Sequence, residues 1–148
     1  MQDHYTRKSQ EALANAQEAA RSAGNPELTP LHLAAALLAE PEGVMASILR
    51  KLDTDPGVLR TELEREIAKL PRQSGGQISA SRAIQDVLAE ASSAARKMGD
   101  QFVSTEHLLL ALTKQGGPEV QGLLAARKLR PERVEAAIGE VRGGKKVT

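Results

Sequence analysis

The sequence contains one helix start twice, 75 residues apart. Residues 28–37 read LTPLHLAAAL and residues 103–112 read VSTEHLLLAL. Adding 75 to a residue number maps one half of the chain onto the other without a gap. The matched pairs include Gly24/Gly99, His32/His107 and Pro56/Pro131. Because glycine, histidine and proline rarely coincide in one register by chance, the pattern indicates an internal duplication. The fold must therefore be built from two copies of one unit.

The repeated segment predicts a capped, buried helix in each copy. Thr29 or Ser104 precedes it and can cap its free N–H groups. In the first copy Pro30 follows at the first helical position, where its missing N–H costs nothing. We expect matched leucines of this helix and the next one to be buried in both copies. These are Leu33/Leu108, Leu37/Leu112 and Leu49/Leu124.

Three further helices are expected in each copy. Thr6 or Ser81 caps the first, short helices follow the loops at 39–43 and 114–118, and a proline begins the last. No segment alternates with period two, so the predicted fold class is all-α, with eight helices as two four-helix repeats related by a pseudo-two-fold axis. The predicted domain is 1–142, with repeat one at 5–70, a connector at 71–79, repeat two at 80–142 and the start of a linker at 143–148.

The composition argues against several classes of function. The chain has no cysteine, which rules out disulfides and zinc sites built on thiolates. Its net charge of +1 gives no field that would attract nucleic acid. No apolar run is long enough to cross a bilayer, and the first ten residues do not lead into a secretory signal. We therefore expect a cytoplasmic protein that binds neither nucleic acid nor membranes.

The histidines and the loop motifs give no sign of catalysis. His32 and His107 each stand at the third position of a predicted helix, and neither has a second ligand four residues on. A local hydrogen bond at the helix start is therefore favoured over a metal pair. The chain also lacks a phosphate-binding loop and a nucleophile motif. We expect no catalytic residue, metal or cofactor in this chain, and hence no enzyme activity.

Two acidic residues of the second copy are candidates for a functional role. Glu106 stands in the first turn of a helix, where the helix dipole favours a carboxylate, and its counterpart is Leu31. Asp100 is typical of a turn. Leu109 and Leu110 replace two alanines of the first copy, which indicates either asymmetric packing or an exposed apolar patch.

Taken in order, these segments resemble the Clp N-terminal repeat domain. The matching stretches are YTRKSQEALANAQ, LTPLHLAAALL, KLPRQSGG, MGDQFVSTEHLLLAL and VRGGKKV, which together span essentially the whole chain. The connector beginning LPR and the closing RGG are most similar to the ClpB type, the bacterial disaggregases. The resemblance implies the N-terminal domain of a homohexameric AAA+ chaperone, whose ATPase modules, with their ATP and magnesium, lie outside this chain.

The resemblance also implies a mode of action. In this family the domain engages unfolded or aggregated polypeptide at a shallow apolar groove, and the parent ring cooperates with a DnaK-type chaperone. Carried over by position, the client-binding residues are Thr6, Leu88, Asp100 and Glu106. We expect these four to lie close together on the surface near the boundary between the copies, and the isolated domain to be a monomer.

An alternative function is the docking of a folded adaptor, as in proteases of the ClpC or ClpA type. Tight binding to a folded adaptor, with weak binding to unfolded chains, would distinguish this alternative. A helical nucleic-acid binder is disfavoured by the even charge, and a stand-alone enzyme by the missing motifs.

Overall fold

The structure, a computed structural model, describes residues 4–148. In this part of the chain the helices are α1 (Arg7–Ser22), α2 (Pro30–Ala39), α3 (Gly43–Lys51), α4 (Pro56–Ile67), α5 (Arg82–Lys97), α6 (Thr105–Gln115), α7 (Pro118–Ala126) and α8 (Pro131–Arg142). Two short strands, β1 (Glu27–Leu28) and β2 (Ser79–Ala80), pair in parallel. The prediction of an all-α fold with eight helices is confirmed. The first three residues of the predicted domain, 1–3, lie outside the described residues.

The helix boundaries follow from the capping residues. Thr6 Oγ1 accepts a hydrogen bond from Ser9 N at 3.1 Å, and Ser81 Oγ accepts one from Ile84 N at 3.0 Å. These bonds satisfy donors that the first turn of α1 and of α5 would otherwise leave free. Both helices end just before a glycine, Gly24 or Gly99, whose φ of +73° or +75° lies in the left-handed region.

Contacts between the helices occur in exchanged pairs. α1 packs on α2 as α5 packs on α6, and across the copies α3 packs on α8 as α7 packs on α4. Backbone bonds cross between the copies in the same way. Thr6 N donates to Val103 O and Ser81 N donates to Leu28 O, both at 3.0 Å, so each bond is the other moved by 75 residues with the copies exchanged. The two repeats are therefore related by a pseudo-two-fold axis, as the duplication predicted.

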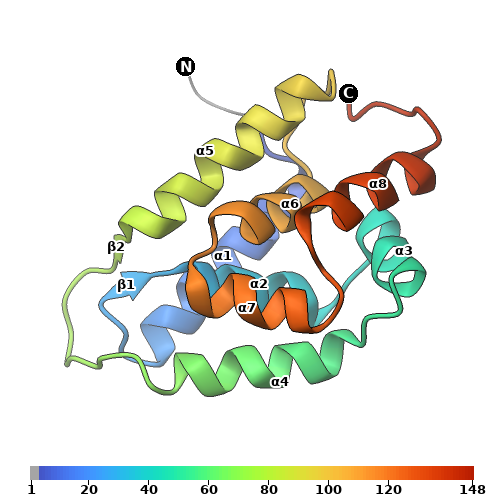
Figure 1. Cartoon of the computed structure of the whole chain (residues 1–148). Helices are drawn as coiled ribbons and strands as arrows, with labels where there is room; N and C mark the ends of the chain where they lie inside the picture. The colour runs from blue at the N-terminus through green and yellow to red at the C-terminus, as the bar shows by residue number, and fades with distance from the viewer. Residues whose placement is uncertain (1–3) are drawn as a thin grey trace.

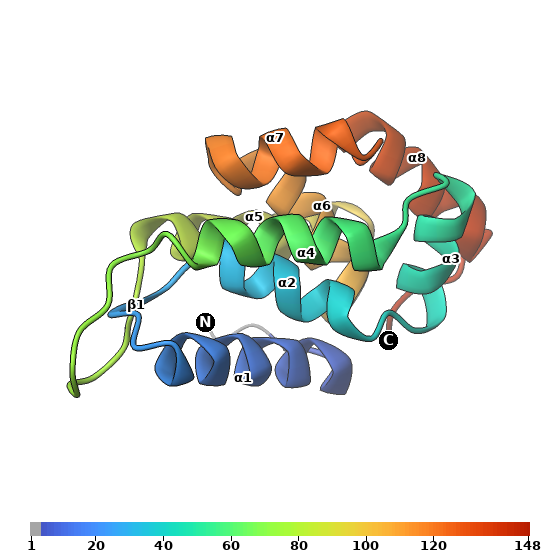
Figure 2. The same ribbon diagram turned by 90° about the horizontal axis from the view of Figure 1, so that it is seen from below.

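The core is centred on α2 and α6. Figure 1 shows α6 in the middle of the molecule, and Figure 2 shows α2 between α1 and α4. The leucine pairs predicted from the repeat are all at most 5% exposed. Leu109 and Leu110 are each 1% exposed, so the longer apolar segment of the second copy reflects asymmetric packing. Val58 is 42% exposed and is the one large hydrophobic residue among 4–148 that is largely exposed to solvent.

Burial of the matched leucines predicts the effect of truncating them. Leu112 is fully buried, so Leu112→Ala should lower the free energy of unfolding by about 2–5 kcal/mol through lost apolar burial and a residual cavity. Val58→Ala is the control and should change it by less than about 0.5 kcal/mol. Urea denaturation of both variants measures the difference, and equal losses would contradict this description of the core.

Candidate functional site

In the first copy, a histidine closes the start of α2. Thr29 N donates to His32 Nδ1 at 3.0 Å. Because Nδ1 accepts this bond, the neutral ring carries its proton on Nε2, which donates to Asn25 Oδ1 at 2.9 Å. Burial lowers the pKa of His32 and so favours the neutral ring. The interpretation of this histidine as a local hydrogen-bonding group is confirmed.

The second copy repeats this arrangement with charged residues. Ser104 N donates to His107 Nδ1 at 2.9 Å, and His107 Nε2 lies 2.7 Å from Asp100 Oδ2. Arg142, at the end of α8, donates to the other oxygen of Asp100, and its Nε lies 3.9 Å from Glu106 Oε2. We call Asp100, Glu106, His107 and Arg142 the α6 cluster. Their side chains are between 0% and 7% exposed, so the cluster is a buried network of compensating charges.

The first copy has different residues at three of the four positions that match the α6 cluster. Subtracting 75 from its four residue numbers gives Asn25, Leu31, His32 and Ile67. The histidine is kept, an amide stands in place of a carboxylate, and two apolar residues stand in place of the glutamate and the arginine. Each copy therefore has the same histidine cap, with uncharged neighbours in the first copy and charged neighbours in the second.

The buried cluster corrects one expectation from the sequence. The side chains of Asp100 and Glu106 are 0% and 5% exposed, so the prediction that they lie on the surface is wrong. Asp100 is also more than a turn residue, since it binds both His107 and Arg142. The physical reason is the guanidinium from α8, which compensates the carboxylates inside the protein and which no local signal around Asp100 reveals.

The other two predicted site residues are half-buried. Thr6 caps α1, and its N–H bonds to Val103 O just before α6. Leu88 lies on α5 and packs against the core. The structure therefore brings Thr6, Asp100 and Glu106 to the region where α6 begins, whereas Leu88 is joined to it through the packing of α5 on α6. Whether the four bind clients stays a prediction.

Asp100 also holds the segment predicted to begin a linker. Val147 N donates to Asp100 Oδ1 at 2.9 Å, and Gln101 N donates to Val147 O at 2.7 Å. Figure 1 shows this segment turning back from α8 to the end of α5. The first copy has a similar contact, in which Gln73 N donates to Gly24 O at 2.8 Å. The chain that follows the fourth helix is thus held against the first helix of the same copy in both repeats.

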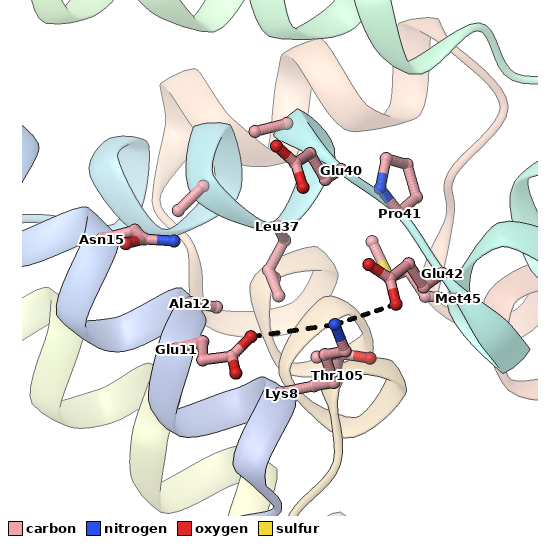
Figure 3. A pocket seen from close by; sticks show the side chains of 12 residues that line it. Lys8, Glu11, Ala12, Asn15, Leu37, Glu40, Pro41, Glu42, Met45 and Thr105 are labelled. Atoms are coloured by element: carbon pink, nitrogen blue, oxygen red, sulfur yellow. Dashed lines mark ion pairs between the residues drawn. The ribbon is translucent and has the colours of Figure 1, made fainter.

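A cleft lies where the first copy meets the start of α6. Its volume is about 150 Å³, and residues of α1, α2, α3 and the α2–α3 loop line it together with Thr105 of α6. We call it the junction cleft. Three buried side chains, Ala12, Leu37 and Met45, give it an apolar lining (Figure 3). Because Thr105 is followed directly by Glu106, the α6 cluster fixes the helix start that lines this cleft.

Charged residues surround the junction cleft. Lys8, Glu11, Glu40 and Glu42 all line it, and all four are exposed. Lys8 Nζ lies 2.8 Å from Glu42 Oε2 and 3.8 Å from Glu11 Oε1. An apolar lining with a few polar groups at its edge is the usual make-up of a ligand site.

The matching place in the second copy is more open. A depression there is lined in part by Asp86, Glu90 and Gln115, the counterparts of Glu11, Asn15 and Glu40. Gly116 and Gly117 stand where the first copy has Pro41 and Glu42. The two copies therefore differ at this place: the first has a cleft with an acidic edge, and the second has a more open depression.

Two other features to consider are a metal site and a membrane-spanning helix. Within residues 4–148, no group of three or more His, Asp or Glu residues is placed to hold a metal ion. In the same part of the chain no single helix is long and apolar enough to cross a membrane. Only α2 and α3 taken together have that length and composition, and they are bent by 93°.

The α6 cluster predicts a stability loss that can be reversed. Asp100→Asn keeps an acceptor for His107 but removes the charge that faces Arg142, so the free energy of unfolding should fall by up to about 3–5 kcal/mol. The triple variant Asp100→Asn, Glu106→Leu, Arg142→Ile installs the residues of the first copy and should regain most of this loss. Urea denaturation tests both variants. A triple variant no more stable than the single one would contradict the proposed equivalence of the two caps.

The α6 cluster also predicts acid sensitivity. Burial raises the pKa of Asp100, but hydrogen bonds from Arg142, Val147 and His107 outweigh it and hold the pKa below its usual value. A lowered pKa contributes stability that is fully present above the unfolded pKa of about 3.9 and is lost as the pH falls through the folded value. The free energy of unfolding should therefore decrease in this acidic range. In a pH series, the decrease should be smaller for Asp100→Asn; identical slopes would exclude this cause.

Comparison with known proteins places the chain in a family. Residues 4–126 match the Clp repeat (R) N-terminal domain. The chaperone protein ClpB of Mycobacterium leprae is 38% identical over 145 residues, and that of Corynebacterium diphtheriae is 39% identical over 146 residues. Each comparison covers 97% of this chain and 17% of the relative, so the chain spans about a sixth of the length of these proteins.

Solved structures show the same fold. The N-terminal domain of Hsp104 from Candida albicans superposes with a TM-score of 0.83 at 22% identity, over 98% of this chain and 95% of the other. A ClpV N-domain in complex with a VipB peptide superposes with a TM-score of 0.72 at 17% identity, over 97% and 90% of the two chains. The match to residues 4–126 and the two ClpB relatives together show that this chain belongs to the Clp N-terminal repeat domain family, with ClpB as the favoured branch.

Proposed function

We propose that this domain engages unfolded or aggregated polypeptide for a ClpB-type AAA+ chaperone, and that the junction cleft is where it does so. The observation that carries the proposal is the cleft itself, which joins a buried apolar lining to an exposed charged edge at the boundary between the copies. The family resemblance likewise implies a shallow apolar groove for polypeptide.

The shape of the cleft favours weak binding of many sequences. A volume of about 150 Å³ accommodates a side chain of an extended segment. Among the described residues, Val58 is the one large hydrophobic residue that is largely exposed. This part of the chain therefore has no broad apolar face for a folded partner. Half of the twelve lining residues are apolar, and they form a small floor that has little means of selecting one apolar sequence. The ClpV N-domain solved with a VipB peptide supports peptide binding on this fold.

The rest of the chaperone would supply the chemistry. In this proposal the domain itself is a monomer without enzyme activity or cofactor. The parent is a homohexamer in the cytoplasm that binds ATP and magnesium in other modules and cooperates with a DnaK-type chaperone. The length of the ClpB relatives, of which this chain covers 17%, leaves room for such modules.

Three matched substitutions to glutamine test the proposed site. Ala36→Gln places a longer polar side chain in the junction cleft, and Leu88→Gln removes the apolar group that the family resemblance assigns to clients. Val58→Gln is the control, because it removes an exposed apolar residue that does not line the cleft. We expect the first two changes to weaken binding of a permanently unfolded, fluorescent protein several-fold, and the control to leave binding unchanged.

Thermal unfolding must show that each variant is folded before its binding is compared. Unchanged binding in the folded Ala36→Gln variant would contradict the role of the cleft. Unchanged binding in Leu88→Gln would remove Leu88 from the client site and leave the cleft as the proposed site.

A further inference from the structure

The junction cleft carries more negative than positive charge. Glu11 of α1, Glu40 at the end of α2 and Glu42 at the start of α3 all line it, and Lys8 is the one cationic side chain among its lining residues. The hydrogen bond to Glu42, together with the charges of Glu42, Glu11 and Glu40, raises the pKa of Lys8. Three carboxylates from three segments thus act on one ammonium group.

Lys8 is an example of a cation held by the carboxylates of the junction cleft. Figure 3 shows its ammonium group between Glu11 and Glu42, in the cleft that Leu37 and Met45 also line. Both partners of the closer ion pair are more than half exposed, with side-chain exposures of 54% for Lys8 and 56% for Glu42. Exposed pairs of this kind contribute little to stability, so a cation from another molecule could replace Lys8 at small cost.

The matching depression in the second copy has fewer carboxylates, and their basic partners lie outside its lining. Each of its two carboxylates has a basic partner on the protein: Arg82 Nε lies 3.5 Å from Asp86 Oδ1, and Lys114 Nζ lies 3.9 Å from Glu90 Oε2. The positions that match the other two glutamates of the junction cleft are uncharged, namely Gln115 and Gly117. Lys114 Nζ also lies 3.7 Å from Glu135 Oε1 and is shared between two carboxylates. The junction cleft therefore differs from its counterpart in the number of carboxylates that line it, three against two, and in having a cation, Lys8, among them.

We propose that the junction cleft selects client segments that carry a lysine or arginine next to apolar residues. The aliphatic part of the basic side chain lies against Leu37 and Met45, and its charge displaces Lys8 from the carboxylates. Long basic side chains commonly bury their stems against apolar surface while the charged end stays in water. This inference rests on the proposed function, because it names the kind of segment that the same cleft prefers.

The test uses the whole domain and three labelled, unstructured peptides. They share one apolar sequence and differ at a central residue, which is lysine, glutamine or glutamate. We expect affinity to fall in that order. The preference for lysine over glutamine should be about 2- to 5-fold for each carboxylate engaged, as for exposed ion pairs. It should vanish near 1 M salt, where the Debye length is about 3 Å.

Variants of the domain locate the effect. Replacing Glu11, Glu40 and Glu42 together by glutamine should abolish the preference for the lysine peptide, and Lys8→Ala should strengthen binding of that peptide by removing the internal competitor. Asp86→Asn is the matched control, since Asp86 is the counterpart of Glu11 in the open depression, and should change nothing.

The outcomes separate this inference from the proposed function. Equal binding of the lysine and glutamine peptides, or a preference that survives loss of Glu11, Glu40 and Glu42 together, would overturn the inference while the proposed function stands. Failure of all three peptides to bind would overturn both.

Discussion

The burial of α2 and α6 is the constraint on which the rest of the structure depends. Every residue of α6 from Glu106 to Thr113 is buried, and α2 buries seven of its residues. A helix buried on all sides needs neighbours on all sides, and one four-helix copy cannot supply them. Each copy therefore covers the other, with α3 on α8 and α7 on α4. The two-fold arrangement follows from the need to bury these two helices.

Burial of the helix starts then determines the polar chemistry inside the protein. The first turn of α2 and of α6 brings unpaired N–H groups into the core, where an unsatisfied polar group is costly. In both copies a histidine at the third helical position accepts a hydrogen bond from one of these N–H groups. Around that shared cap the copies have diverged. One is closed by apolar residues, and the other by an arginine from α8 that also fixes the start of α6 beside the junction cleft.

Much of the fold could be predicted because its signals are local or repeated. Hydroxyl caps, prolines and glycines marked the helix ends, and the 75-residue register identified the buried leucines. The placement of Asp100 and Glu106 was mispredicted because their partner, Arg142, comes from another helix. Comparing the copies offered one signal: Leu31 and Ile67 in the first copy match Glu106 and Arg142 in the second, a paired change from apolar to charged. The residues of the junction cleft come from four separate elements, so no local pattern could indicate them.

The central claim is that the junction cleft receives unfolded polypeptide. Chemical-shift mapping of the isotope-labelled domain during titration with a permanently unfolded protein tests it most directly. The largest shifts should fall on backbone amides within 8–15 and 36–45 and on Thr105, the segments that contain the lining residues, and the matching depression around Asp86 and Glu90 should be unaffected. Shifts of equal size at both places, or shifts confined to the second copy, would contradict it.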